Sequence, residues 1–305
     1  MAAERIAVVG AGLMGHGIAQ VFAAAGHTVS VTDEDPAVLA SAPGRIRDNL
    51  ERLGVDPSPA EAIRLCTGLE AAVADADVVF EAAPERLELK RGLFERISRC
   101  VSPHALLATN TSVIAVGEIA AQAVEPGRVV GTHWWNPPYL IPLVEVTQAA
   151  ATSADTIDRT IALLERAGKA PIHVRRDIPG FIGNRLQHAL WREAFALVAA
   201  GVCDAESLDR VVKTSFGPRL AVLGPMENAD LVGLDLTLDI HDYLLPHLDT
   251  SADPSPRLRE LVEQGELGMK TGAGFRRWSD EEARETRERL FDHLAATTTS
   301  RQELA

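Results

Sequence analysis

A histidine and a glutamate lie on two apolar segments that are close in the sequence. His133 ends the run at residues 128–133, and Glu145 lies inside the run at residues 142–147. Histidine can take a proton from an alcohol near neutral pH, and it works best when a carboxylate orients it. A carboxylate inside an apolar run is costly unless it is paired. We therefore expect His133 to act as a general base that Glu145 orients, provided that the two segments pair as strands.

Two more polar residues follow apolar or turn segments. Ser112 comes just after the apolar run that ends at Asn110, and its hydroxyl could hydrogen-bond the reacting oxygen of an alcohol. A serine in this place also commonly caps the N-terminus of a helix. Asn184 follows Pro179-Gly180-Phe181, in what we predict to be the first turn of a helix that faces a cleft between domains. We take both side chains as candidates for the same site.

A glycine-rich turn lies near the start of the sequence, between a strand pattern at residues 5–10 and a helix pattern at residues 12–25. Gly10 permits the tight turn, Gly12 lets the backbone approach a pyrophosphate, and Gly15 lets the helix pack closely on the strand. The pyrophosphate would lie over free N–H groups at the helix N-terminus. The predicted cofactor-binding segment is Gly10-Ala11-Gly12-Leu13-Met14-Gly15.

An acidic residue ends the second predicted strand, at residues 27–32. Asp33 should accept hydrogen bonds from the adenine ribose hydroxyls, and its charge would repel a 2′-phosphate. A glycine triplet alone is weak evidence of a cofactor, but its place between strand and helix, with the acid after the next strand, is specific. The pattern therefore predicts NAD as the cofactor and disfavours NADP.

The elements that must position these residues alternate between helix and strand patterns. Further strands are predicted at residues 76–81, 106–110, 128–133, 142–147 and 171–174, and helices at residues 36–53, 87–100 and 153–168. This alternation predicts an α/β fold with a doubly wound Rossmann-type parallel sheet.

The pattern changes after Asp177-Ile178-Pro179-Gly180. Strand patterns vanish, and helical patterns cover residues 181–201, 205–216, 230–244 and 256–265. We therefore predict two domains, an NAD-binding domain at residues 1–178 and an all-helical domain at residues 179–305. The polar end of the chain, residues 297–305, is predicted to be frayed.

Composition excludes several classes of partner. The net charge of −13 disfavours nucleic acid and anionic membranes as partners. The sequence contains no apolar run of about 18 residues and no signal-peptide pattern, so we expect a cytoplasmic protein. The three cysteines are far apart, lack metal-ligand spacing and suit a reducing compartment, so no metal site is predicted.

Five segments together resemble the L-3-hydroxyacyl-CoA dehydrogenase family nearly end to end. They read VVGAGLMGHGIA, NTS at residues 110–112, GTHWWNPPYLIPLVEV, DIPGFIGNRL and GMKTGAGF. The resemblance implies an N-terminal NAD-binding domain and a helical C-terminal domain that forms a homodimer. It also implies oxidation of the hydroxyl of a 3-hydroxyacyl-CoA, of the 3-hydroxybutyryl-CoA type in fatty acid metabolism, by hydride transfer.

Residue roles follow from the same resemblance. It implies that His133 is the general base, that Glu145 orients it, and that Ser112 and Asn184 bind the region of the reacting oxygen. The other matching positions lie near the cofactor: Glu85, Lys90, Asn110, Ser112, Asn136 and Lys270. Composition alone gives the turn of Lys270, at residues 268–275, no role.

The chain departs from the acyl-CoA members between Asp33 and Glu81. In those members a long basic helical arm follows the second strand and helps to hold the CoA phosphates. Here the segment is shorter, and only Arg45, Arg47 and Arg52 remain as candidate phosphate partners. The segment at residues 83–85 and the tract at residues 136–138 look more like relatives that act on gulonate, carnitine or a pyridine alcohol.

Two alternatives therefore stay open beside the acyl-CoA dehydrogenase. One is the same chemistry on a hydroxy acid or alcohol without CoA. The other is a non-catalytic NAD-binding protein of the crystallin kind, which would have no need of the catalytic set. Trp134 and Trp135, which follow His133, could shape the substrate site or belong to the core.

Overall fold

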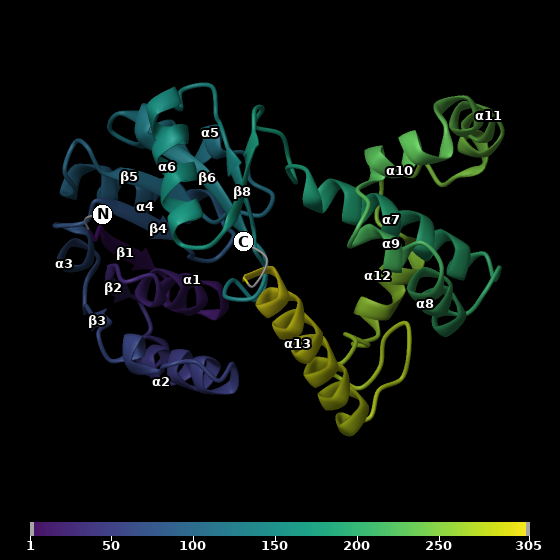
Figure 1. Cartoon of the computed structure of the whole chain (residues 1–305), viewed down its shortest axis with the longest axis horizontal. Coiled ribbons are helices and arrows are strands. Elements are labelled where there is room, and N and C mark those ends of the chain that lie inside the picture. The colour runs from purple at the N-terminus through teal and green to yellow at the C-terminus, as the bar shows by residue number, and fades with distance from the viewer. Residues whose placement is uncertain (1–2, 303–305) are drawn as a thin grey trace. The chain divides into compact units, whose positions relative to one another are not determined.

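The computed structural model describes residues 3–302, which form two units. The first unit comprises residues 3–184 and 292–302, and the second comprises residues 185–291. Figure 1 shows the layered α/β architecture of the first unit and the helices of the second.

The first unit is built on an eight-stranded sheet, with strand order β3-β2-β1-β4-β5-β6-β7-β8. All neighbouring strands are parallel except β6 and β7, which are antiparallel. The strands are β1 (Arg5–Val9), β2 (Thr28–Thr32), β3 (Arg64–Leu65), β4 (Val78–Glu81), β5 (Leu106–Thr109), β6 (Val129–Trp134), β7 (Leu143–Thr147) and β8 (Ala170–Val174). The predicted fold class is confirmed, with one antiparallel pair added to the expected parallel sheet.

The sheet has a topological switch point between β1 and β4. The chain proceeds from β1 outward to β2 and β3, then returns to place β4 on the other side of β1. The loops that leave β1 and β4 at this point therefore diverge to opposite faces, which opens a crevice at the carboxyl ends of the strands. Gly10 follows β1 and Ala82 follows β4, so the glycine turn lies at the crevice.

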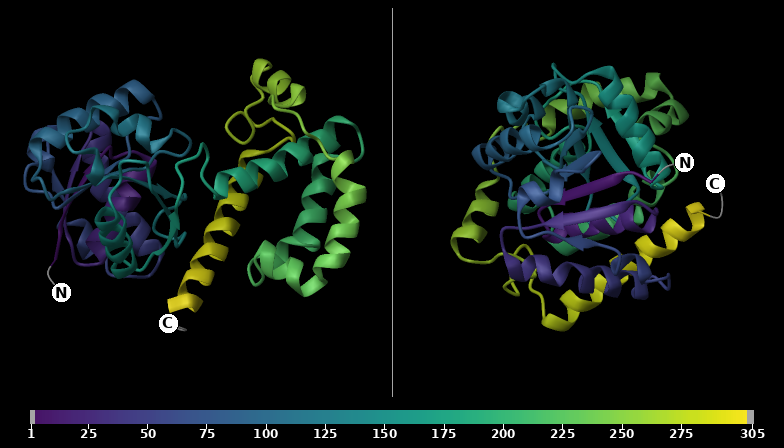
Figure 2. Two further views of the ribbon diagram at one scale, coloured as in Figure 1. Left: turned by 90° about the horizontal axis from the view of Figure 1, so that it is seen from above. Right: turned by 90° about the vertical axis from the view of Figure 1, so that its left-hand side faces the viewer.

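Helices cover both faces of the sheet because its strands are apolar on both sides (Figure 2). Ile6 and Val8 of β1 belong to one buried cluster, and the alternate residues Ala7 and Val9 belong to the other. The first cluster includes residues of α1 (Leu13–Ala24), α2 (Pro36–Arg52) and α6 (Ala154–Arg166). The second includes residues of α3 (Leu69–Val73), α4 (Leu87–Cys100) and α5 (Val116–Ile119).

The second unit is helical. From the end of the first unit onward the helices are α7 (Gly183–Ala199), α8 (Ala205–Thr214), α9 (Gly217–Leu220), α10 (Pro225–Val232), α11 (Leu234–Leu244), α12 (Pro256–Glu263) and α13 (Asp280–Gln302). One short 3-10 helix, η4 (Leu245–His247), lies in this unit, and three lie in the first unit: η1 (Ser58–Ala60), η2 (Ala120–Gln122) and η3 (Pro126–Arg128).

Two details differ from the sequence-based predictions. The helix predicted at residues 230–244 is broken at Gly233, whose φ of 104° lies outside the helical region, so α10 and α11 are separate. The prediction of a frayed end at residues 297–305 is wrong for residues 297–302, which continue α13; residues 303–305 lie outside the described part. Three acidic residues in the first turn of α13 and an Arg284–Glu288 pair support this polar helix.

Between residues 3 and 302, none of the helices has the length and apolar character that crossing a membrane requires.

Candidate active site

The antiparallel pairing of β6 and β7 places His133 directly opposite Glu145. His133 Nδ1 lies 2.7 Å from Glu145 Oε2, and the side chains are 5% and 1% exposed. A carboxylate can only accept, so Nδ1 carries the proton and donates it to Glu145. His133 Nε2 is then left with a lone pair, which is the state that a general base requires.

The second oxygen of Glu145 is held by a backbone turn. Oε1 accepts the N–H groups of Ile182, at 2.8 Å, and Gly183, at 2.9 Å. The turn that presents them includes Gly180 and Phe181, with φ values of 76° and 47°. A left-handed conformation is unusual for a buried phenylalanine, and such strain is typical of functional sites.

These bonds decide the charge of Glu145. Burial raises its pKa, but the hydrogen bond to His133 and those from the backbone of Gly183 and Ile182 outweigh burial, so the pKa lies below its ordinary value. Glu145 is therefore an anion at neutral pH. It can stabilise a proton on His133 as well as orient the ring.

The same turn connects the histidine pair to Ser112. Asn184 directly follows Gly183, and its Nδ2 donates to the carbonyl oxygen of Ser112 at 3.1 Å. Ser112 does not cap a helix, because the next helix, α5, begins only at Val116. The first unit thus brings His133, Glu145, Ser112 and Asn184 together through one short segment.

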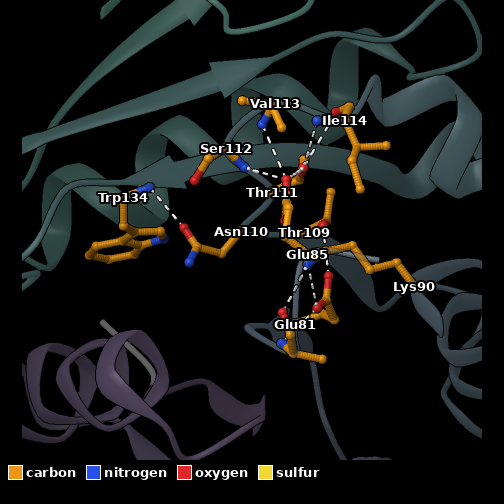
Figure 3. A network of polar contacts seen from close by, with 11 residues as sticks. Glu81, Glu85, Lys90, Thr109, Asn110, Thr111, Ser112, Val113, Ile114 and Trp134 are labelled. Atoms are coloured by element: carbon orange, nitrogen blue, oxygen red, sulfur yellow. Dashed lines mark hydrogen bonds and ion pairs between the residues drawn. The ribbon is translucent and has the colours of Figure 1, made fainter. Parts of the chain in front are cut away.

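Glu85 fixes the loop that carries Ser112 (Figure 3). Its Oε1 accepts the Thr111 hydroxyl at 2.5 Å and the backbone N–H groups of Ser112, at 3.0 Å, and Val113, at 3.2 Å. Burial raises the pKa of Glu85, but these bonds and the charge of Lys90 lower it further than burial raises it. Glu85 is therefore an anion that stabilises the turn after β5.

Beneath this loop lies a fully buried ion pair, Lys90 with Glu81. Lys90 Nζ is 2.8 Å from Glu81 Oε1, and both side chains are 0% exposed. Lys90 Nζ also donates to the Ala83 carbonyl at 3.2 Å, and Glu81 accepts the Ala83 N–H at 2.7 Å and the Thr109 hydroxyl at 2.7 Å. Lys90 has no exposed surface that a cofactor could contact. It can act on the crevice only through its hydrogen bond to the Ala83 carbonyl and its ion pair with Glu85.

Two asparagines flank the end of β6. Asn110 Oδ1 accepts the backbone N–H of Trp134 at 3.0 Å and so ties the end of β5 to the end of β6 (Figure 3). Asn136 is exposed and precedes a cis bond to Pro137. Both residues therefore lie at the carboxyl edge of the sheet, where ligands bind in this class of fold.

The glycine turn has the shape of a dinucleotide cradle. A Cβ on Gly10 would lie 2.7 Å from the Ala82 carbonyl oxygen, and one on Gly15 would lie 1.7 Å from the Gly10 oxygen. A Cβ on Gly12 would meet nothing within 4 Å, so this face of the turn is open to a ligand. α1 begins after Gly12 with no side-chain cap and no acid in its first turn, which leaves its N–H groups for an anion. The residues present fit a bound pyrophosphate.

Asp33 and Arg45 form hydrogen bonds to the backbone of this turn. Asp33 Oδ2 accepts the Ala11 N–H at 2.6 Å, and its Oδ1 accepts the Asp35 N–H at 2.9 Å. Arg45, from α2, donates to the carbonyl oxygens of Ala11 and Gly12. Arg45 is thus committed to the turn, which the sequence did not indicate.

Trp134 and Trp135, which follow His133, have different surroundings. Trp134 is 2% exposed and packs edge-on against Phe22 and Phe80, at ring distances of 5.9 Å and 6.0 Å. Trp135 lies two residues after His133, and its ring centroid is 5.3 Å from that of the histidine. Trp134 is therefore core, and Trp135 is a neighbour of His133.

Lys270 belongs to a tight turn of the second unit. Gly268 N–H donates to the Ala273 carbonyl at 2.6 Å, and a Cβ on Gly274 would lie 2.8 Å from the Gly268 Cα. Lys270 is exposed at the tip of this turn. The glycines are explained by the close backbone approach.

Comparison with known proteins decides the family. The family model of the 3-hydroxyacyl-CoA dehydrogenase NAD binding domain matches residues 5–178, and that of the C-terminal domain matches residues 180–278. The chain belongs to the 3-hydroxyacyl-CoA dehydrogenase family. It is an NAD-dependent dehydrogenase, and NAD is its cofactor.

Members of this family with different substrates resemble the chain about equally. It is 34% identical over 277 residues to the 5-formyl-3-hydroxy-2-methylpyridine 4-carboxylate 5-dehydrogenase of Mesorhizobium japonicum, covering 89% of this chain and 90% of that protein. It is 37% identical over 284 residues to a probable 3-hydroxybutyryl-CoA dehydrogenase of Bacillus subtilis, covering 90% and 97%. A crystal structure of the first type of enzyme, described as an NAD+ dependent dismutase, has a TM-score of 0.90 and 31% identity, with 97% of each chain covered.

Proposed function

We propose that this dehydrogenase oxidises the hydroxyl group of a small hydroxy acid or aromatic alcohol, with His133 as general base. The observation that carries the proposal is the buried His133–Glu145 pair, in which Nδ1 donates to a carboxylate and Nε2 keeps a lone pair. Bound NAD would supply the acceptor for a hydride from the carbinol carbon. His133 Nε2 takes the hydroxyl proton, and the Glu145 anion stabilises the imidazolium that results.

Ser112 and Asn184 complete the proposed site on the substrate side. The Ser112 hydroxyl would donate to or accept from the reacting oxygen and so orient it toward His133. Asn184 donates to the Ser112 carbonyl, and the N–H of its neighbour Gly183 donates to Glu145. One turn therefore fixes both the loop of Ser112 and the carboxylate that orients His133. A protein that only stored NAD would have no use for this arrangement.

The cofactor would be held at the switch point of the sheet. We assign the pyrophosphate to the turn at residues 10–15 and the adenine ribose to Asp33, and we place Glu85, Asn110 and Asn136 near the cofactor. For Lys270, in the second unit, a role near the cofactor rests on the family resemblance alone. Each oxygen of Asp33 already accepts one N–H and retains a lone pair for a ribose hydroxyl. Lys90 stabilises this region through its buried ion pair with Glu81 and does not contact the cofactor itself.

One candidate phosphate partner is committed elsewhere, which favours a substrate without CoA: Arg45 donates to the carbonyl oxygens of Ala11 and Gly12. Arg47 lies in an exposed ion pair with Glu61, with 3.5 Å between Nη2 and Oε1, and a pair of this kind is weak, so Arg47 stays a candidate phosphate partner. A 3-hydroxybutyryl-CoA thioester, as in fatty acid metabolism, is the second candidate, favoured by both family models and by the Bacillus relative. The free thiols of Cys66, Cys100 and Cys203 suit the cytoplasm as its place of action.

A substrate panel tests this function. We expect NADH to form with at least one of 3-hydroxybutyrate, carnitine, gulonate or a hydroxymethylpyridine carboxylate, and NADP to serve at least about tenfold less well because of the Asp33 charge. Activity with 3-hydroxybutyryl-CoA should be insensitive to removal of the 3′-phosphate. A strong, salt-sensitive dependence on that phosphate would instead assign the protein to the thioester, and absence of NADH with every compound would refute the proposed substrate class.

We also propose that the protein is a homodimer through its helical unit. Within residues 185–291, all of them described, only two hydrophobic side chains, Leu261 and Ala283, are buried. Monomeric proteins rarely expose apolar patches larger than a few hundred Å². The large exposed side chains of this unit include Leu220, Met226, Leu231, Leu234, Leu238 and Tyr243. A second copy would supply the missing core.

Sedimentation equilibrium should show twice the mass of one chain at micromolar concentration. Leu234→Asp with Leu238→Asp should shift the protein toward monomer and lower its Tm, because buried carboxylates destabilise an apolar interface. Val55→Asp is the matched control, since Val55 is 50% exposed in the first unit and should leave the mass unchanged. A wild-type protein that sediments as a monomer would overturn the proposal.

A further inference from the structure

Trp135 occupies the side of the chain on which the base lies. β6 ends at Trp134, and side chains alternate along a strand, so His133 and Trp135 point to one face while Trp134 points to the other. The indole of Trp135 is tilted by 55° to the His133 ring, and Phe181 lies on the base as well, with its ring centroid 5.7 Å from that of His133. The imidazole therefore has two aromatic neighbours.

The indole also rests on the turn that carries Asn184. A Cβ built on Gly183 would lie 2.5 Å from Trp135 Cζ2 and 3.3 Å from Cε2. Real Cβ contacts are not that short, so the six-membered ring occupies the volume that a side chain at residue 183 would fill. Trp135 is thus wedged between the base and the segment that holds Glu145 and Ser112.

Within the described part of the chain, the Trp135 indole is held in this position by packing and not by a hydrogen bond. The indole N–H of Trp135 is buried and has no acceptor among residues 3–302. The residue as a whole is half-buried. A change of Trp135 to a smaller side chain would therefore remove volume without removing a hydrogen bond.

We propose that Trp135 is a specificity-determining residue, which limits the space beside His133 and confines the substrate to a compact group on the carbinol carbon. This rests on the proposed role of His133 as base, because a carbinol bound at His133 would lie near an indole whose centroid is 5.3 Å from that of the imidazole. A short hydroxy acid or a single flat ring fits this restriction. An acyl chain extended from the carbinol carbon does not.

The test compares a short and a long substrate in variants of Trp135. The kcat/KM values of 3-hydroxybutyrate and 3-hydroxyoctanoate, and of their CoA thioesters, would be measured with wild type, Trp135→Phe and Trp135→Ala. We expect the long-to-short ratio to rise in that order, by about tenfold or more in the alanine variant, because a few methylene groups in a fitted site are worth at least that factor. Trp134→Phe, the same change on the opposite face of the strand, should lower the Tm but keep the ratio.

Gly183 gives a second, independent readout. Gly183→Ala in the wild type should reduce turnover, because the new methyl group displaces the indole. In the Trp135→Ala background the same change should be tolerated, because the volume is free. Equal losses in the two backgrounds would show that the two residues do not compete for space.

An unchanged long-to-short ratio in Trp135→Ala, with turnover retained, would overturn the inference and leave the proposed function standing. If the wild type oxidises neither acid nor thioester, the proposed function fails for this class. The inference is then tested by calorimetry of the same short and long compounds on the protein–NADH complex. Binding of the long compound that does not improve in Trp135→Ala would overturn it there too.

Discussion

His133→Gln should lower kcat by about 10²- to 10⁴-fold, the usual contribution of a positioned general base. Glutamine can still donate to Glu145, but its amide cannot take a proton from an alcohol at neutral pH. The residues proposed to bind the pyrophosphate and the adenine ribose, from Gly10 to Asp33, follow β1 and β2 rather than β6, so NAD should still bind. The measurement is NADH formation under saturating substrate, beside NADH binding followed by fluorescence.

His173→Gln provides the matched control for this loss. His173 lies on β8, half-buried, with its Nε2 3.0 Å from Gln148 Oε1, so it tests the removal of a partnered imidazole outside the site. Its kcat should stay within a factor of about two of wild type, as for a surface substitution away from the chemistry. If His133→Gln kept wild-type turnover, the general-base mechanism would be wrong.

The histidine pair shows what strand periodicity can predict. Two apolar runs separated by a short tract favour neighbouring strands, and an acid inside one of them requires a partner. The antiparallel register then places His133 on Glu145. The same periodicity separates Trp134 from Trp135, since only Trp135 shares the face of His133.

The backbone partners of Glu145 could not be predicted from side-chain patterns. Every residue carries an N–H, so nothing marks those of Ile182 and Gly183 before the turn is built. Gly180 marked a turn, but the left-handed Phe181 beside it is set by tertiary packing. The ring of Phe181 is 1% exposed and packs on His133, which offsets the strain locally.

Glu81 was missed, although it had a signal. It is an acid at the end of the apolar strand β4, as Glu145 is an acid within the apolar strand β7, and Lys90 follows on the next helix. The short elements β3, α3 and α5 were missed for another reason. They have two, five and four residues, too few to show a period of 2 or 3.6.

Glu145→Gln should lower kcat by about 10²- to 10⁴-fold, a size comparable to the loss of a triad carboxylate that leaves its histidine in the wrong tautomer. The two backbone N–H groups at Oε1 require an acceptor, so they fix the amide oxygen of glutamine at that position. The amide NH₂ then faces His133 Nδ1 as a donor. His133 must accept there, and Nε2 carries the proton that it should instead receive.

The size of this loss separates orientation from charge. Glu145→Asp keeps the anion but shortens the side chain, so it should retain more turnover than Glu145→Gln while losing contact with either the turn or His133. The pKa of Glu145 lies below its ordinary value, so Glu145 stays charged as the pH falls through the range in which a histidine ordinarily titrates. The fall of wild-type kcat at acid pH should therefore not reflect protonation of Glu145. A glutamine variant as active as the aspartate variant would show that neither the tautomer nor the charge of the pair matters to the reaction.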